Sequence, residues 1–319
     1  MRKYLVTGGA GFIGSHLSAQ LLNEGSEVTV LDNFDPFYSR GLKRSNLENL
    51  IGREGFRLIE GDINDESTLS GLLGTEFHAI VHLAAKAGVR PSIANPLSYQ
   101  HVNVAGTQTL LEFARKCGVP QFVFASSSSV YGVNPNVPWR EDDCVLRPIS
   151  PYAATKVTGE LLGHVYAHLY GIRFVALRFF TVYGPRQRPD LAIRKYAELL
   201  LAGRSLPVFG DGTTSRDYTY VDDVVAGIRA AIHYDGAAYE VVNLGNEKPI
   251  NVLDMIRTLE DTLEIRARLD FLPPQPGDVP RTWAGIAKAR RLFGYEPRTP
   301  FVEGIGRFAA WIRENNSPI

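Results

Sequence analysis

The stretch Thr7-Gly8-Gly9-Ala10-Gly11-Phe12-Ile13-Gly14 decides the fold, because its glycines have the spacing GxxGxxG between a short apolar strand and a helical pattern. We expect the strand over Tyr4–Thr7 and the helix over Phe12–Asn23, where apolar residues recur on one side. Glycine permits the tight turn and lets backbone N–H groups approach a pyrophosphate at the helix N-terminus. The spacing therefore predicts a dinucleotide-binding loop.

Acidic residues after the next two strands bear on the kind of dinucleotide. The strand expected over Val28–Leu31 ends at Asp32, 18 residues after Gly14. A carboxylate there accepts hydrogen bonds from ribose hydroxyls and repels a 2′-phosphate, which favours NAD over NADP. Asp62-Ile63 follows the third strand, where it could contact adenine, but Asp62 could equally cap a helix that begins before Glu66.

Strand and helix patterns alternate through the first half of the chain. Further strands are expected over Phe56–Ile59, Ala79–Leu83, Phe122–Ala125 and Phe174–Leu177, with helices at 66–73, 97–116 and 151–170. This alternation predicts an α/β fold with a doubly wound parallel sheet of the Rossmann type.

The second half is less regular. Helices are expected at 191–202, over Asp222–His233 with an aspartate cap, and over Phe301–Glu314, with a strand over Tyr239–Leu244 and a proline-rich loop over Pro273–Pro280. We therefore expect residues 1–178, with returning segments at about 215–250, to bind the dinucleotide. Residues 179–214 and 251–319 would form a smaller C-terminal α/β lobe for the substrate.

Composition excludes several classes of partner. The 319 residues include 34 basic and 34 acidic ones, so no positive excess favours nucleic acid or an anionic membrane. Cys117 and Cys144 make neither a disulfide framework nor a zinc cage, and we expect ordinary thiols in the cytoplasm. His164 and His168 have the spacing of a zinc-binding pair, but no glutamate stands at position 165. We therefore expect a surface or interface pair and predict no metal. His82 is expected to support the fold. The N-terminal apolar run is too short for a signal peptide, and no stretch approaches the ~20 apolar residues of a membrane span.

A tyrosine and a lysine stand four residues apart in Ser150-Pro151-Tyr152-Ala153-Ala154-Thr155-Lys156. The Ser-Pro pair is typical of a helix start, and the spacing places Tyr152 and Lys156 on one helix face. A neighbouring ammonium lowers the pKa of tyrosine from its ordinary value of about 10, which suits a general base for a sugar or alcohol hydroxyl. Ser127, at the end of the fifth strand, can share a hydrogen bond between Tyr152 and the substrate.

Together these motifs resemble the nucleotide-sugar epimerase branch of the extended short-chain dehydrogenase/reductase family. The matching segments are Thr7–Gly14, Asp62-Ile63, His82-Leu83-Ala84-Ala85, Asn103-Val104-x-Gly106-Thr107, Ser126–Gly132, Tyr152-x-x-x-Lys156, Arg178–Gly184, Arg216-Asp217-Tyr218 and Pro276-Gly277-Asp278. One departure is Gly285, which stands where relatives often have an aspartate that would cap a helix.

The resemblance implies a tightly bound NAD that is recycled in each turnover. It would oxidise C4 of a UDP-sugar, after which the hydride returns to the other face of the 4-keto sugar. Tyr152 would take the proton of the 4-hydroxyl, and Lys156 would also hold the nicotinamide ribose. The residues implied to contact NAD are Gly8, Gly11, Phe12, Ile13, Gly14, Asp32, Asn33, Asp62, Ile63, Leu83, Ala84, Ala85, Lys86, Asn103, Tyr152, Lys156 and Phe179.

Two segments bear on the identity of the sugar. Relatives that dehydrate sugars carry Asp-Glu where this chain has Ser128-Ser129, so the acids of a 4,6-dehydratase are missing. The stretch Ala87–Ser92, which contains Arg90, and the stretch Phe179–Asp190 resemble those of UDP-glucuronate 4-epimerases, whereas UDP-galactose epimerases usually carry Asn in place of Thr181. The hydroxyls of Ser127, Ser128, Ser129 and Thr181, with Arg186 nearby, could hold the sugar carboxylate, although Arg186 and Arg188 could equally lie in a solvated loop.

By the same resemblance, the UDP half binds in the C-terminal lobe. The segment Leu206–Phe209, with Val208, would contact uracil, Arg216 the diphosphate and Asp278 the uridine ribose. Lys195 is either a further phosphate contact or an exposed helix lysine. Family members commonly pair as homodimers through the helices here at 97–116 and 151–170. The alternatives left open are a UDP-glucose/galactose or N-acetyl-sugar 4-epimerase, a decarboxylating enzyme that makes a UDP-pentose, and an NAD-sensing regulator.

Overall fold

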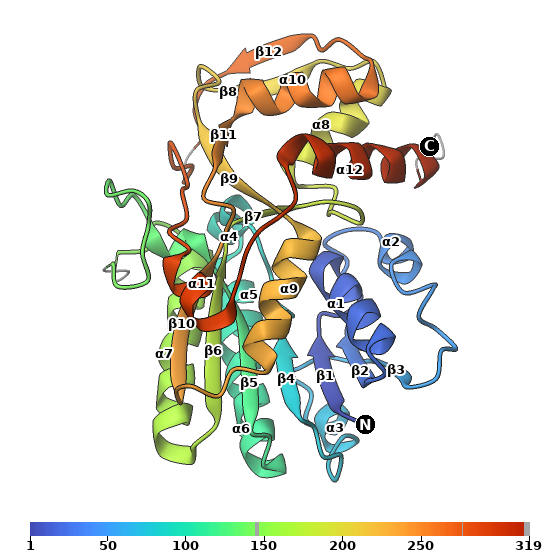
Figure 1. Cartoon of the computed structure of the whole chain (residues 1–319), viewed down its shortest axis with the longest axis vertical. Coiled ribbons are helices and arrows are strands. Elements are labelled where there is room, and N and C mark those ends of the chain that lie inside the picture. The colour runs from blue at the N-terminus through green and yellow to red at the C-terminus, as the bar shows by residue number, and fades with distance from the viewer. Residues whose placement is uncertain (144–146, 276, 316–319) are drawn as a thin grey trace.

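A seven-stranded parallel sheet forms the centre of the molecule. The computed structural model describes residues 1–143, 147–275 and 277–315, so Cys144 and Pro276 lie outside the described residues. The strand order is β10-β6-β5-β4-β1-β2-β3 (Figure 1). The strands are β1 (Lys3–Thr7), β2 (Glu27–Asp32), β3 (Phe56–Glu60), β4 (Ala79–His82), β5 (Gln121–Ser127), β6 (Arg173–Phe179) and β10 (Tyr239–Leu244). The predicted doubly wound α/β fold of the Rossmann type is confirmed.

Helices cover both faces of this sheet. On one face lie α1 (Phe12–Asn23) and α9 (Val221–Ile232), and on the other lie α3 (Glu66–Ser70), α6 (Gly106–Cys117) and α7 (Pro151–Tyr170). Strand alternation produces this division, because Val6 and Val30 pack in the first core while Leu5 and Leu31 pack in the second. All four side chains are fully buried, as expected for a parallel sheet covered on both faces.

A smaller lobe lies above the carboxyl ends of the central strands in Figure 1. One small sheet has the order β11-β9-β7 and a second pairs β12 with β8. The elements are β7 (Thr181–Tyr183), α8 (Ala192–Leu201), β8 (Leu206–Phe209), β9 (Ser215–Tyr220), β11 (Pro249–Asn251), α10 (Val252–Leu263), β12 (Leu269–Leu272) and α12 (Phe301–Asn315). Helix α11 (Ala287–Phe293) packs instead against β10 and α9 of the central layer, although residues 251–319 were expected in the smaller lobe (Figure 1). The short strands of this lobe were not predicted, because each has only three to six residues and none shows a clear alternation.

The helix predicted over 97–116 is interrupted. The structure has α4 (Val89–Ala94), α5 (Pro96–Tyr99), a π-helical segment over Gln100–Ala105 and then α6. A π-helical turn shifts the residues that follow it around the helix axis, and such turns are frequent at functional sites. Helix α2 (Arg40–Ser45) follows β2 along the chain. A 3₁₀ turn over Ser128–Tyr131 directly follows β5.

Two expected helix caps, and a third that the sequence left as an alternative, are not found in the structure. Helix α9 begins at Val221 after Tyr220, so Asp222 lies inside its first turn, where a carboxylate favours the positive end of the helix dipole. The cap of α3 is Asp65, which accepts a hydrogen bond from Ser67 N, and not Asp62. The residue before α11 is Ile286, so Gly285 does not replace a cap; instead, a Cβ there would approach the carbonyl oxygen of Trp139 to 3.0 Å.

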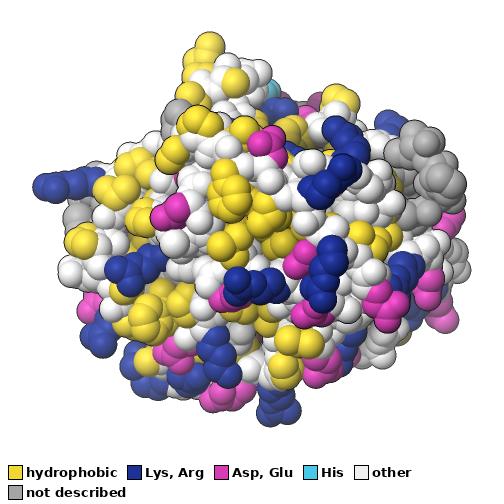
Figure 2. All heavy atoms as spheres, turned by 90° about the horizontal axis from the view of Figure 1, so that it is seen from above, with side chains coloured by type: hydrophobic (Ala, Val, Ile, Leu, Met, Phe, Trp, Pro, Cys, Tyr) yellow, Lys and Arg dark blue, Asp and Glu magenta, His cyan; other side chains and the backbone are white. Residues whose placement is uncertain are grey.

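The face seen from above the smaller lobe mixes the two signs of charge. Figure 2 shows basic and acidic side chains interspersed, with apolar side chains between them. Among the described residues, no helix combines the length and apolar character that crossing a membrane requires.

Candidate active site

The loop between β1 and α1 requires glycine at two of the three positions that the motif fixes. Gly8 has a φ of +69°, and a Cβ there would lie 2.7 Å from the backbone nitrogen of Ala84. A Cβ at Gly14 would lie 2.4 Å from the carbonyl oxygen of Gly8. The loop therefore stays bare beside the first turn of α1, which fits the close approach of a pyrophosphate to backbone N–H groups.

Asp32 ends β2 beside this loop. Its carboxylate accepts hydrogen bonds from the backbone nitrogens of Ala10, at 3.0 Å, and Phe34, at 2.8 Å. Burial raises the pKa of Asp32, while these two bonds and the positive charge of Lys43 oppose the rise. The side chain is thus fixed at the position where a ribose would meet it.

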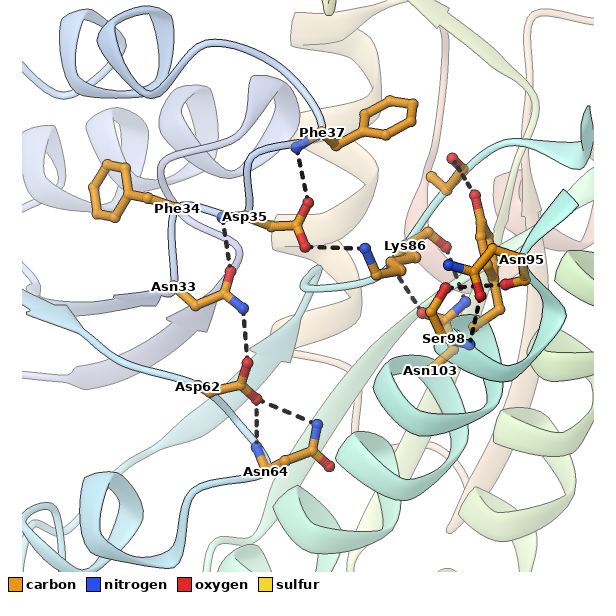
Figure 3. A network of polar contacts seen from close by, with 12 residues as sticks. Asn33, Phe34, Asp35, Phe37, Asp62, Asn64, Lys86, Asn95, Ser98 and Asn103 are labelled. Atoms are coloured by element: carbon orange, nitrogen blue, oxygen red, sulfur yellow. Dashed lines mark hydrogen bonds and ion pairs between the residues drawn. The ribbon is translucent and has the colours of Figure 1, made fainter. Parts of the chain in front are cut away.

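One cavity brings many of the predicted cofactor residues together at the carboxyl ends of the strands. Asn33 Nδ2 donates to Asp62 Oδ2 at 2.7 Å, and Asp62 Oδ1 accepts from Asn64 N at 2.8 Å (Figure 3). The predicted residues that line the cavity are Gly8, Asp32, Asn33, Asp62, Ile63, Leu83, Ala84, Ala85 and Lys86. Its lining also includes residues that the sequence did not single out, among them Asp35, Phe37, Tyr38, Lys43 and Tyr99.

Polar contacts of Lys86 and Asn103 join the segments around this cavity. Lys86 Nζ lies 3.0 Å from Asp35 Oδ2, so the loop after β2 is joined to the loop after β4 (Figure 3). The backbone nitrogen of Lys86 donates to Asn103 Oδ1 at 2.8 Å, and Asn103 Nδ2 donates to Lys86 O at 2.9 Å and to Thr155 Oγ1 at 3.0 Å. Asn103 lies in the π-helical segment and thereby connects the cavity to α7, which carries Tyr152. The sequence motif marked Asn103 but not this connection.

Tyr152 and Lys156 lie in the first turns of α7, as predicted. Ser150 caps the helix by accepting a hydrogen bond from Ala153 N at 3.1 Å, and Pro151 occupies the first turn. Lys156 is buried, and its Nζ donates to the carbonyl oxygen of Ala125 in β5 at 2.7 Å. The same nitrogen lies 5.9 Å from the centre of the Tyr152 ring. The chain therefore assembles a phenol and an amine at the carboxyl edge of the sheet.

The expected lowering of the Tyr152 pKa is wrong for the protein without ligands. Burial raises the pKa of Tyr152, and a hydrogen bond with Ser127 and the positive charge of Arg188 only partly oppose it. Burial also lowers the pKa of Lys156 to about 7, against the opposing effect of Glu160. Because Lys156 is so strongly desolvated, its charge alone does not produce a phenolate here.

The serine run forms a compact group of hydroxyls. Ser127 Oγ accepts hydrogen bonds from Ser129 N at 3.2 Å and from Ser129 Oγ at 3.0 Å. Ser128 begins the 3₁₀ turn and is partly exposed. Thr181 begins β7, two residues beyond Phe179, the register partner of Ser127. Phe179 itself is partly buried at the end of β6.

The two arginines between the prolines lie in different surroundings. Arg186 has a φ of +63° and follows Pro185, whose carbonyl oxygen lies 3.0 Å from His16 Nε2 of α1. Burial lowers the pKa of Arg186, and no ion pair is recorded for it among the described residues. Arg188 lines the cofactor cavity, pairs with Asp190 at 2.6 Å and opposes the rise of the Tyr152 pKa. Arg188, which the sequence left as an open alternative, is thus the arginine that acts electrostatically on Tyr152.

The predicted uridine end lies where α4 approaches the smaller lobe. Arg90 Nη2 lies 2.6 Å from Asp278 Oδ2, and its guanidinium lies 4.9 Å from the ring centre of Phe209. Burial lowers the pKa of Arg216, which Asp278 raises and Arg90 lowers, so these three charges act on one another. The side chain of Val208 is fully buried, so only its backbone remains available to a ligand, and Lys195 is exposed on α8.

Other candidate groups belong to the framework. His82 is buried, with Nδ1 2.8 Å from Thr7 Oγ1 and Nε2 3.0 Å from Thr107 Oγ1, and burial lowers its pKa to about 3. His164 and His168 are exposed on α7, and Cys117 is half-buried. Within residues 1–143, 147–275 and 277–315, no cluster of three or more His, Cys, Asp or Glu could hold a metal ion.

Comparison with known proteins bears on the family to which the chain belongs. The family model described as "NAD dependent epimerase/dehydratase family" matches residues 4–245. UDP-glucuronate 4-epimerase 2 of Arabidopsis thaliana is 44% identical over 96% of this chain and 75% of its own length. The structure of UDP-glucuronic acid 4-epimerase from Bacillus cereus, in complex with UDP-glucuronic acid and NAD, is 39% identical, covers 98% of this chain and 100% of that chain, and superposes with a TM-score of 0.93.

A relative that acts on another sugar is also similar. The UDP-glucose 4-epimerase of Thermotoga maritima, solved with UDP-glucose, is 33% identical, covers 98% of this chain and 99% of that chain, and has a TM-score of 0.90. The family model spans more than half of the chain, and the identities exceed the level at which a shared family is secure. The chain therefore belongs to the NAD dependent epimerase/dehydratase family, and the predicted membership is confirmed.

Proposed function

We propose that the protein is an NAD-dependent UDP-sugar 4-epimerase that interconverts UDP-glucuronate and UDP-galacturonate. The observation that carries the proposal is the grouping of Ser127, Tyr152 and Lys156 at the carboxyl edge of the sheet. The centre of the Tyr152 ring lies 6.2 Å from that of Tyr99, which lines the cavity beside the glycine loop. The relatives that act on UDP-glucuronate support the choice of sugar.

The side chains divide the work between them. Tyr152 accepts the proton of the 4-hydroxyl, and Ser127 shares a hydrogen bond with the phenol. NAD, when bound, takes the hydride from C4 and returns it to the opposite face of the same carbon. Lys156 would hold the nicotinamide ribose, and the positive charge of Arg188 favours the phenolate.

A carboxylated sugar demands one further function from the site. Oxidation at C4 makes a β-keto acid, which readily loses carbon dioxide, so the carboxylate must be held where C–C cleavage is disfavoured. Ser127, Ser128, Ser129 and Thr181 supply hydroxyls for this purpose, and Arg186 or Arg188 supplies a positive charge. Of the two arginines, the influence of Arg188 on Tyr152 favours Arg188. The serines at 128 and 129 also leave the site without the acid pair of a dehydratase.

The UDP half and the remaining sequence predictions belong to the same proposal. Arg90, Arg216, Asp278 and the backbone of Val208 would bind UDP, with Lys195 as an outer phosphate contact. Residues 1–178 and about 215–250 would form the cofactor domain; the presence of α9 and β10 in the central layer supports this division. The balanced charge and the low cysteine content support a cytoplasmic protein with no nucleic-acid or membrane partner.

The sugar is tested by incubating the purified protein, without added NAD, with UDP-glucuronate and separately with UDP-glucose. We expect chromatography to show UDP-galacturonate from the first and little change in the second. Turnover of UDP-glucose alone would favour the UDP-glucose/galactose alternative. Carbon dioxide as the main product would replace the epimerase by a decarboxylating enzyme, and no turnover with tight NAD binding would favour a regulator.

We further propose a homodimer that pairs through α7. Leu161, Val165 and Leu169 are 56%, 45% and 60% exposed, and their spacing of four residues puts them on one face of the helix. Leu97, beside this region in α5, is 79% exposed. Such a stripe favours a partner surface of the same kind. Light scattering should give twice the mass of the chain, and Val165→Glu should yield a monomer; a monomeric parent protein would contradict the proposal.

A further inference from the structure

A buried ion pair lies directly behind the catalytic residues. Glu160 and Arg178 have side chains that are only 5% and 3% exposed, and Arg178 Nε and Nη2 donate to the two oxygens of Glu160 at 2.9 and 2.8 Å. Arg178 comes from β6, while Glu160 comes from α7. Glu160 follows Lys156 by one helical turn and Tyr152 by two, so the three side chains share one face of α7.

Glu160 also holds the strand that carries the catalytic serine. Ser126 Oγ donates to Glu160 Oε1 at 2.5 Å, and Ser126 immediately precedes Ser127 at the end of β5. Lys156 Nζ donates to the carbonyl oxygen of Ala125, one residue earlier, at 2.7 Å. Helix α7 thus binds two consecutive residues of β5 just before Ser127. Ser126 therefore faces Glu160, while Ser127, the last residue of the strand, contacts Tyr152 and Ser129.

The partners of Arg178 extend this network to the neighbouring strands. Ser126 and Arg178 are direct register partners of β5 and β6. The guanidinium of Arg178 lies 4.8 Å from the ring centre of Tyr131, whose hydroxyl donates to Asn243 Oδ1 of β10 at 2.7 Å. The polar side chains of Ser126, Glu160, Arg178 and Tyr131 therefore all have partners, and their contacts join the carboxyl ends of β5, β6 and β10.

We propose that Glu160 is a positioning residue of the epimerase, which aligns Ser127 with Tyr152 through Ser126 and supplies the anion for the buried cations Lys156 and Arg178. The proposal rests on the epimerase function. Breaking a buried charge pair leaves the remaining charge without compensation, so removing the carboxylate acts on the whole cluster.

The charges around Lys156 make the role of Glu160 measurable. The titratable and charged groups that face Lys156, Glu160 or Arg178 are Tyr152, His82, Tyr131, Glu141 and Tyr239, besides these three residues themselves. Glu160 is the anion that raises the pKa of Lys156. Without that carboxylate the pKa of Lys156 falls below its value of about 7. The ammonium is then lost at lower pH, so the alkaline limb of the rate profile moves to lower pH. A purely structural loss would instead lower the rate equally at every pH.

The test compares Glu160→Gln and Ser126→Ala with Glu240→Gln, which removes the carboxylate of an ion pair with Lys288 away from the site. For each purified holoenzyme, kcat and KM for UDP-glucuronate are measured from about pH 6 to about pH 9, together with the bound NAD and the melting temperature. In Glu160→Gln we expect the alkaline limb to move down by about one pH unit and kcat at alkaline pH to fall roughly tenfold, with KM changed less than about twofold.

Ser126→Ala should lower kcat roughly fivefold at every pH and leave the limb in place, because it removes one hydrogen bond and no charge. Ser126→Thr, which restores a hydroxyl, should recover most of the rate, and Glu240→Gln should match the parent protein. A folded Glu160→Gln with the parental kcat and limb would overturn the proposal. If Glu160→Gln fails to fold, Ser126→Ala decides, and a parental kcat there would overturn it. If the parent turns over another UDP-sugar, the proposed sugar fails, and the variants are compared on that sugar instead.

Discussion

Helix α7 and the segment around Asp278 hold their functional side chains in different ways. At the catalytic end, Lys156 is buried and bonded to β5 at 2.7 Å, and Glu160 fixes the adjacent strand residue. At the uridine end, Arg90 and Asp278 form an ion pair between side chains that are 45% and 35% exposed. Exposed ion pairs contribute little to stability, whereas buried hydrogen-bonded networks fix one geometry.

The difference follows from what each end does. Proton and hydride transfer require reacting atoms within a few tenths of an ångström of one position, and regular elements supply that precision. Nucleotide binding distributes its free energy over several contacts, so a partly exposed ion pair on a loop is sufficient there. Substitutions at the catalytic end should therefore have large effects on kcat, and substitutions at the uridine end should have small effects on KM.

The largest effect is expected for Tyr152→Phe. Loss of the general base should lower kcat by about 10³-fold or more, within the range that acid–base catalysis supplies and beyond that of one ordinary hydrogen bond. Bound NAD should remain, because the glycine loop and Asp32 are untouched. Steady-state kinetics and the absorbance of released NAD measure both quantities. Parental turnover by this variant would remove Tyr152 from the mechanism.

The next effect concerns the free energy of unfolding, which depends on pH through the buried residue His82. His82 has a pKa of about 3 in the folded protein and about 6.5 when unfolded, because burial disfavours its charged form. The unfolded chain therefore binds the proton first, and stability is lost as pH falls from about 6.5 toward 3. Between about pH 6.5 and pH 4 this group should account for on the order of 3 kcal/mol. Denaturant melts of His82→Asn should show a shallower loss over that range, with exposed His168→Asn unchanged from the parent; equal slopes would contradict the assignment.

A smaller effect is expected for substitution of Arg188, which lines the cofactor cavity. Burial raises the pKa of Tyr152 and the charge of Arg188 partly offsets it, so Arg188→Gln should raise that pKa further. Since the base acts in its deprotonated form, the acid limb of the rate profile should move to higher pH, with roughly tenfold lower activity near neutrality. Arg186→Gln is the matched comparison, because Arg186 does not act on Tyr152 and should leave the limb unmoved. A shift in Arg186→Gln alone would exchange the two roles.

The smallest effect is expected at the uridine end. Asp278→Asn removes the charge that pairs with Arg90 and should raise KM for the UDP-sugar about fivefold, which corresponds to one hydrogen bond, while kcat stays constant. Initial-rate measurements over a range of UDP-sugar concentrations separate the two parameters. A large fall in kcat without a change in KM would show that Asp278 acts in catalysis, as the residues of α7 do, and would contradict the contrast between the two ends.

The same contrast explains what could be predicted from the sequence. Gly8, Asp32, Tyr152 and Lys156 lie in the elements that the sequence predicted, because each motif falls within one strand–loop–helix unit, where local spacing determines which side chains meet. The 3.6-residue period also identified the long helices, although it missed the π-helical segment, which depends on packing between helices.

Contacts between distant segments were not predictable in this way. The electrostatic link between Arg188 and Tyr152 joins residues on a loop and a helix, and the bond between Glu160 and Ser126 joins a helix and a strand. No spacing in one sequence reports such pairs. The direction of the Tyr152 pKa was wrong for a related reason, since the depth of burial that raises it arises only when the chain is folded.

The central claim is that a resident NAD returns the hydride to the sugar from which it came. Its most direct test uses UDP-glucuronate that carries deuterium at C4, mixed with an equal amount of UDP-glucuronate labelled with carbon-13 throughout the sugar. Mass spectrometry and NMR of the UDP-galacturonate should find the deuterium at C4 of the molecules without carbon-13, with none lost to water. Deuterium on the carbon-13 molecules, or its replacement by solvent hydrogen, would contradict the account.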